Sequence, residues 1–239
     1  MLSGMEILNQ IEKGNIVISD FDKSRLNPNS YNIRLGNKLK VYTKATITVD
    51  ELSVEISKRM EPYAEEYEEI SKALLDGKDN ILSEEENEKR NKRLQEIYKK
   101  KEEISTQVLR EYALDPKKDN ETTDIEIPEE GYVLIPGILY LGETMEYTET
   151  YGLVPNIDGR STTGRLGIEV HRTAGFGDTG FKGKWTLEIT VTHTVIVYPG
   201  MEIGQLYYET IEGDTSMSYN GKYQNQQGVQ AAKVDKEYK

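Results

Sequence analysis

The stretch that decides the fold is "KWTLEITVT", residues 184–192. Large apolar side chains alternate with polar ones along it, which is the period of a β-strand with one face in a core. Similar short runs recur from residue 124 onward, separated by Gly, Pro and Asn turns, with no long helical pattern between them. This part of the chain therefore predicts a mainly β protein, either a barrel or a jelly roll.

The polar face of the same strand carries Glu188 among Thr186, Thr190 and Thr192. A lone glutamate in a row of threonines on a β-branched strand is a candidate for lining a polar cavity. The alternative is an ordinary solvated sheet face, which the sequence alone favours slightly.

The N-terminal segment 3–14 predicts a short helix. Ser3 and Glu6 have the spacing of a capping box, and Gly14 can end the helix. Two strands then follow within "NIVISD" and "SYNIRLGNKLKVY".

Residues 52–118 differ from both flanks and predict a helical hairpin with a narrow apolar seam. The seam residues are Ile56, Met60, Tyr63, Tyr67, Ile70, Leu74, Leu94, Ile97, Ile104 and Val108. Pro62 is expected to begin the first long helix, because proline is tolerated in a first turn, and residues 83–86 form another capping box. The hairpin is either a partner-binding arm or a self-packed surface insertion, and we favour the second.

Composition excludes several classes of function. The chain has 239 residues and a net charge of −12, which disfavours nonspecific binding to nucleic acid or to anionic membranes. It has no cysteine and two histidines, so thiolate zinc sites, cysteine nucleophiles and a multi-histidine metal site within one chain are excluded. No apolar run approaches the length of a membrane span, and no signal peptide is evident, so we expect a cytoplasmic protein.

Positive charge is concentrated in "GRSTTGRLG", residues 159–167. Two arginines flank hydroxyl residues that could begin a short helix, which suits a phosphate group. The alternative is a capped surface turn. Residues 173–183, "TAGFGDTGFKG", predict a tight hairpin with an aromatic wall, or a plain turn. The polar end of the chain is either a disordered tail or a flap that orders over a ligand.

Taken together, these segments resemble the dCTP deaminases, a branch of the trimeric dUTPase superfamily. The resemblance rests on "GRSTTGRLGIEVHRTAGFGDTGFKGKWTLEI", "YPGMEIGQLYY" and "GKYQNQQG". It spans residues 1–48 and 124–235 and leaves the hairpin outside. It implies a distorted dUTPase-like barrel or jelly roll over residues 1–239, with 52–118 as an insertion and 214–239 as a C-terminal flap. It also implies a homotrimer with active sites between subunits.

The resemblance also assigns roles to residues. Glu188 would take a proton from water and return it, Ser161 and the carbonyl of Ala174 would orient that water, and Arg165 would hold Glu188. Asp178 would lie near the sugar and Phe181 against the deoxyribose. The candidate catalytic residues are Ser161, Arg165, Ala174, Asp178 and Glu188. The candidate substrate-binding residues are Arg160, Ser161, Thr162, Thr163, Gly164, Arg165, Asp178, Phe181, Thr186, Leu187, Glu188, Gln205, Tyr219, Lys222 and Gln226.

Three functions are compatible with these residues. The first is dCTP deamination, which in the two-step members of the family continues to dUMP and diphosphate; the glycine at Gly175 favours these members. The second is a plain dUTPase, and the third is a non-catalytic nucleotide-binding regulator. The deaminases that the chain resembles use no catalytic metal, and Mg²⁺ is expected only on the substrate triphosphate.

Overall fold

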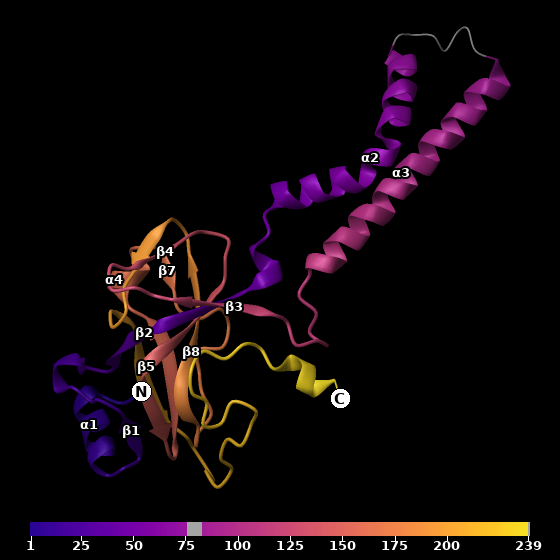
Figure 1. Cartoon of the computed structure of the whole chain (residues 1–239). Helices are drawn as coiled ribbons and strands as arrows, with labels where there is room; N and C mark the ends of the chain where they lie inside the picture. Colours follow the sequence, from indigo (N-terminus) through magenta and orange to yellow (C-terminus); the bar gives the residue numbers. More distant parts are fainter. Residues whose placement is uncertain (76–82, 239) are drawn as a thin grey trace. The chain divides into compact units, whose positions relative to one another are not determined.

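The computed structural model describes residues 1–75 and 83–238 (Figure 1). The chain forms two compact units, one made of Met1–Thr43 and Asp115–Lys239 and the other of Lys44–Leu114. No helix among the described residues is long and apolar enough to cross a membrane.

The first unit is mostly β, as expected. Its strands are β1 (Ile16–Ile18), β2 (Tyr31–Tyr42), β3 (Thr122–Glu126), β4 (Tyr132–Leu134), β5 (Tyr140–Thr150), β6 (Leu153–Gly159), β7 (Ile168–Glu169), β8 (Lys182–Val191), β9 (Val195–Val197) and β10 (Glu202–Thr210). Its helices are α1 (Gly4–Glu12), α4 (Ser161–Gly164) and the 3₁₀ turns η1 (Lys23–Arg25) and η4 (Val234–Glu237), while η2 (Thr43–Thr46) leads into the second unit.

The strands form a barrel-like sheet. Their order is β6-β10-β2-β5-β8-β7, with β1 beside β5 and β3 beside β2, and β4 pairs separately with β9. The segment after β7 returns to β6, where the Ile157 N–H donates to the Gly175 carbonyl at 2.6 Å and the Gly177 N–H donates to the Pro155 carbonyl at 2.7 Å. This return nearly closes the sheet on itself.

Strand β8 shows why the sequence folds this way. Its residues alternate between buried and half-buried along the whole strand, and Leu187 and Ile189 are fully enclosed in the barrel core. The other face, which carries Thr186 and Glu188, points away from that core. The predicted two-faced strand is confirmed over residues 182–191, and Thr192 lies beyond its end.

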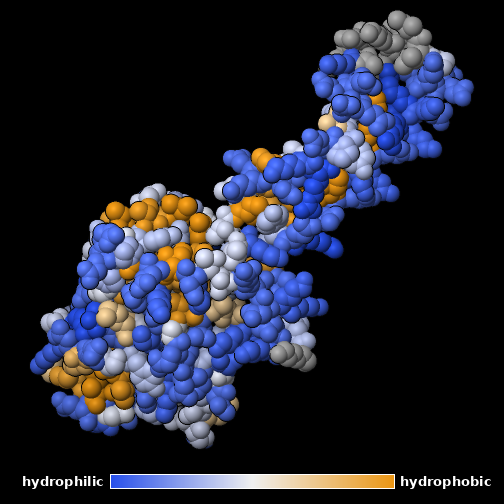
Figure 2. All heavy atoms as spheres, in the orientation of Figure 1, coloured by the Kyte–Doolittle hydropathy of each residue, from blue (hydrophilic) through white to orange (hydrophobic). Residues whose placement is uncertain are grey.

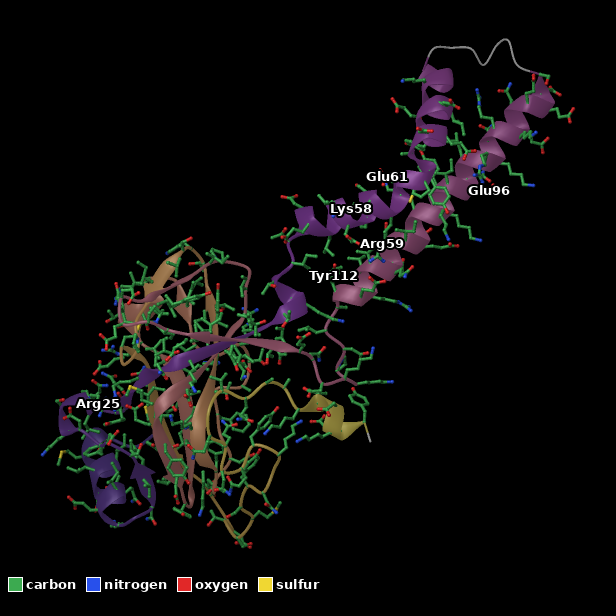
Figure 3. The ribbon with its side chains drawn as sticks, in the orientation of Figure 1. Arg25, Lys58, Arg59, Glu61, Glu96 and Tyr112 are labelled. Carbon is green, nitrogen blue, oxygen red and sulfur yellow. The ribbon has the colours of Figure 1, made fainter. Side chains whose placement is uncertain are left out.

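A buried ion cluster ties the N-terminal region to the sheet. Glu146 on β5 is completely enclosed and accepts hydrogen bonds from Arg25 Nη1 at 2.5 Å and Arg34 Nε at 2.7 Å. Arg25 is labelled in Figure 3. A buried carboxylate requires such partners, since an unpaired charge would be strongly destabilising. The predicted N-terminal helix is confirmed as α1, with the Ser3 hydroxyl accepting from the Glu6 N–H at 3.2 Å.

The second unit contains α2 (Val49–Leu75) and α3 (Glu84–Tyr112), which pack on each other. Ile97, Ile104 and Val108 of the predicted seam are buried, and hydrophobic atoms appear along the hairpin among mostly hydrophilic ones (Figure 2). The capping box at 83–86 is confirmed. The Leu74 side chain and the connection 76–82 lie outside the described residues.

The expectation that Pro62 begins a helix is wrong, because Pro62 lies inside α2. Proline lacks the N–H that would bond the carbonyl four residues earlier, and the α2 ribbon changes direction near Glu61 (Figure 3). Ion pairs with α3 lie on either side of Pro62 in the sequence. Arg59 donates to both carboxylate oxygens of Glu111, at 3.0 and 2.7 Å. Arg93 makes the same kind of bidentate interaction with Glu66.

The hairpin is inserted between two paired strands. Tyr42 at the end of β2 is the register partner of Thr122 at the start of β3, and the Thr43 N–H donates to the Glu121 carbonyl at 3.1 Å. The two ends of the insertion are therefore adjacent in the sheet.

Candidate active site

A cavity of about 410 Å³ lies against the outer face of β8. Strands β2, β5 and β8 contribute to it, as do the loop before β8 and the C-terminal segment. Its lining residues are Tyr42, Leu139, Leu141, Gly177, Asp178, Phe181, Trp185, Thr186, Glu188, Tyr219, Tyr223, Gln226, Gln230, Ala231 and Ala232. Six of the sequence-predicted residues therefore meet here: Asp178, Phe181, Thr186, Glu188, Tyr219 and Gln226.

Glu188 is held at the cavity wall by the backbone of the neighbouring segment. Its Oε2 accepts a hydrogen bond from the Arg172 N–H at 2.9 Å, and its own N–H donates to the Val170 carbonyl at 2.9 Å. None of the described residues donates to Oε1. The carboxylate is thus oriented by one fixed dipole and retains an acceptor oxygen for a water molecule or a substrate.

Aromatic rings form one side of the cavity. Phe181 packs against Trp185 with ring centroids 5.2 Å apart and against Tyr219 at 5.9 Å, while Trp185 Nε1 donates to Thr148 Oγ1 at 3.0 Å. A Cβ atom on Gly177 would lie 2.6 Å from the Trp185 ring, so only glycine fits there. Phe181, Trp185 and Tyr219 therefore form an aromatic wall. Phe176, the other phenylalanine of the predicted hairpin, is 66% exposed and does not line the cavity.

The C-terminal segment lies along β8 (Figure 1). Gln226 Nε2 donates to the Lys184 carbonyl at 2.5 Å, and the Gln230 N–H donates to Thr186 Oγ1 at 3.3 Å. Gln226 is 9% exposed, and its Oε1 is buried without a hydrogen-bond partner. A buried acceptor without a partner is costly, so a ligand donor in the cavity would be favoured beside it.

Seven of the other predicted residues lie away from this cavity, on and around α4 and on the neighbouring part of β10. Arg160 pairs with Glu202 at 2.8 Å, and the Thr163 hydroxyl lies within hydrogen-bond distance of the Arg160 and Ile203 carbonyls. Gln205 Nε2 donates to the Gly159 carbonyl at 3.0 Å. Ser161, Thr162 and Gly164 form the exposed part of α4 beside Arg165.

For four residues, the position in a single chain differs from the role that the family resemblance implies. Arg165 Nη1 donates to the Ser161 carbonyl at 3.2 Å, so the partner of Glu188 is the Arg172 N–H instead. The Leu187 side chain is enclosed in the core, because strand alternation turns it away from Glu188, so only its backbone can face the cavity. Ala174 is exposed and does not line the cavity. The Lys222 ammonium bonds Glu237, which raises the pKa of Lys222.

Sequence reasoning missed Tyr42, Tyr223, Gln230 and Arg172. Tyr223 lies inside the quoted "GKYQNQQG" motif, which was a usable signal. Tyr42 reaches the cavity from a strand that is distant in sequence, which no local pattern reveals. Across residues 1–75 and 83–238, no group of three or more His, Cys, Asp or Glu side chains is arranged to hold a metal ion.

A protein-family model described as dCTP deaminase-like matches residues 1–85 and 93–211. The chain belongs to this family. Relatives named "dCTP deaminase, dUMP-forming" from Leptospira biflexa, Cytophaga hutchinsonii and Hathewaya histolytica are 38%, 40% and 38% identical over 238 residues. These alignments cover all of this chain and 98%, 98% and 99% of the relatives.

A solved structure of a 2′-deoxycytidine 5′-triphosphate deaminase from Agrobacterium tumefaciens is also similar, with a TM-score of 0.48 and 15% identity. The match covers 87% of this chain and 48% of that one, so this chain spans about half the length of the solved protein.

The expectation that the helical hairpin lies outside the family match is wrong. The dCTP deaminase-like model runs through residue 85 and resumes at 93, and the curated relatives align along the whole chain. The change of pattern at residue 52 therefore reflects the second compact unit of this chain, which spans Lys44–Leu114 rather than the predicted 52–118.

Proposed function

We propose that this chain converts dCTP to dUMP, ammonia and diphosphate. The observation that carries the proposal is that Glu188, Thr186 and Asp178 line one cavity. It is supported by full-length similarity to relatives named as dUMP-forming dCTP deaminases. Such an enzyme would supply dUMP for thymidylate synthesis in the cytoplasm, where nucleotides are made.

In this proposal Glu188 is the proton carrier of the deamination. Its carboxylate removes a proton from water as the water oxygen bonds to C4 of cytosine. The Glu188 carboxyl delivers this proton to N3. It then takes the second proton from the new C4 hydroxyl and passes it to the amino group, so the C4 carbonyl forms, the C4–N bond breaks and ammonia leaves. The Arg172 N–H fixes Oε2 during this exchange. A second water then attacks the α-phosphate and releases diphosphate, with Asp178 as the candidate to orient it.

We further propose that the site is completed by a second chain in a homotrimer. The predicted residues fall into two groups within one chain, the cavity group and the α4 group (residues 160–165 with Gln205). The exposed hydroxyls and guanidinium of the α4 group suit a triphosphate, which would carry its own Mg²⁺ as part of the substrate. A site shared between copies would bring Ser161 and Arg165 to Glu188.

A single-turnover time course with labelled dCTP tests the reaction. We expect dUMP and diphosphate to appear together with one ammonia for each dCTP, with little free dUTP. Stoichiometric free dUTP without diphosphate would instead identify a deaminase that stops at the first step. Turnover of dUTP alone would identify a dUTPase, and binding of both nucleotides without turnover would identify a regulator.

Mixing two inactive variants tests the shared site. Glu188→Gln disables the cavity group and Arg165→Ala disables the α4 group, so each is expected to be inactive alone. After unfolding and refolding together in equal amounts, random trimers would regain activity at about one quarter of their sites. Recovery of no activity from a mixture that is still trimeric would show that one chain supplies both groups.

A further inference from the structure

The C-terminal segment is fastened to the barrel at a point beyond β8. Tyr42, the last residue of β2, accepts a hydrogen bond at its Oη from the Ala232 N–H at 2.9 Å. Its ring belongs to a small buried cluster with Leu141 and Val229, and Tyr42 itself is 8% exposed. This contact joins residues that are 190 positions apart in the sequence.

A second contact holds the very end of the segment. The Lys117 ammonium lies 5.6 Å from the centre of the Tyr238 ring, a distance at which a cation and an aromatic face attract each other. Tyr42 and Lys117 flank the helical hairpin in the sequence, since the second unit begins at Lys44 and ends at Leu114.

These anchors bear directly on the cavity. Tyr42, Gln230, Ala231 and Ala232 are all lining residues, and Gln226 lies a few residues before them. Between Gln226 and Val229 the chain turns at Gly228, whose φ of +70° marks a bend rather than a continuous strand. The chain on each side of this bend therefore needs its own attachment to the barrel. Gln226, before the bend, is attached to β8, and the residues after the bend are attached to Tyr42.

We propose that Tyr42 is a positioning residue that fixes residues 229–232 across the cavity and so keeps Gln226 and Gln230 in place for the nucleotide. This rests on the proposed function in naming a nucleotide as the ligand. Tyr42 acts on the substrate only through the C-terminal segment. Its hydroxyl oxygen accepts the Ala232 N–H, and its ring packs on Val229.

Hydrogen exchange of peptides covering residues 227–233 tests the anchor without requiring activity. Tyr42→Phe keeps the ring and removes the acceptor, and we expect exchange there to rise about fivefold. Tyr42→Ala also removes the packing, and we expect more than tenfold. The matched control is Tyr140→Phe, which removes the same kind of bond, from the Ile135 N–H at 3.2 Å, at a tyrosine that does not line the cavity. Segment exchange equal to that of the unmodified protein in both Tyr42 variants would overturn the proposal.

The affinity for dCTP tests the consequence for the site. It is measured in a Glu188→Gln background through emission of Trp185, the only tryptophan and a lining residue. Tyr42→Ala should weaken dCTP binding about tenfold, because only those molecules whose residues 229–232 lie across the cavity bind dCTP with full affinity. Tyr140→Phe should leave the affinity unchanged. A freed segment with unchanged affinity would also overturn the proposal. If the unmodified enzyme neither binds nor converts dCTP, the proposed function fails, and the exchange comparison still decides whether Tyr42 is the anchor.

Discussion

Replacing Glu188 with glutamine should abolish deamination while leaving the fold and nucleotide binding in place. Glutamine keeps the length of the side chain, and its carbonyl oxygen can still accept the Arg172 N–H that Glu188 Oε2 accepts at 2.9 Å. Leu187 and Ile189, enclosed on either side, fix the strand. The free energy of unfolding should therefore change by less than about 1 kcal/mol, the net value of one hydrogen bond.

The expected loss of rate follows from the two proton transfers assigned to this one side chain. A positioned acid or base contributes about 10²–10⁴-fold to a rate. Because glutamine can neither take the proton from water nor return it, kcat for ammonia release should fall by at least about 10³, or roughly 4 kcal/mol in the barrier.

The assay combines ammonia release with dCTP binding followed by Trp185 emission. The matched control is Glu169→Gln, since Glu169 lies on β7 beside Thr190, accepts from Thr190 Oγ1 at 2.9 Å and does not line the cavity. Its charge is exposed and screened, so the control should retain activity within about threefold. Near-normal ammonia release by Glu188→Gln would refute the mechanism, and equal losses in both variants would refute a specific role for Glu188.

Three further outcomes are expected. Replacing residues 44–114 with a short Gly/Ser linker should preserve turnover and oligomeric state, because the flanking strands are already paired; a monomeric or inactive product would contradict this. Truncation after Gly213 should lower kcat/KM at least about tenfold through loss of Gln226 and its neighbours, with Tm little changed; unchanged kcat/KM would argue against the flap. Acidification should loosen the hairpin. Hydrogen bonds from Arg93 and Arg59 lower the pKa values of Glu66 and Glu111 below 4.5. The two ion pairs therefore stabilise the folded hairpin above pH 4.5, and this stabilisation is lost as the pH falls through the lowered pKa values. Equal protection factors of the helix amides at pH 3.5 and 6, corrected for the intrinsic pH dependence of exchange, would contradict this.

Much of the β-fold could be predicted because its signals are local. The alternation along β8 specifies which side chains enter the core, and this alone places Thr186 and Glu188 together on the outer face. The same rule places Leu187 in the core, so strand geometry already limited that residue to a backbone role.

The errors arose where distant contacts outweighed a local rule. Pro62 lies within α2, and α2 packs on α3, a tertiary contact that the local rule for proline does not include. Tyr42 reaches the cavity only because β2 ends beside β5 and beneath the C-terminal segment, a juxtaposition that the topology creates. The Arg172 N–H could not be chosen as the partner of Glu188 without knowing how β7 and the following residues run along β8.

The outer face of the sheet carries a second glutamate, and comparing the two explains why only one suits proton transfer. Glu143 on β5 is the register partner of Thr186, so its side chain is on the same face as Glu188. However, its side chain is only 8% exposed, it pairs with the Lys184 ammonium at 3.3 Å, and it is packed so closely that a Cβ on Gly36 would lie 2.8 Å from its Cγ. This carboxylate is enclosed and paired with a cation, so it is not open to a substrate. Glu188 has a single backbone donor and an open cavity, so the environment of each carboxylate, rather than its residue type, assigns a structural role to one and a chemical role to the other.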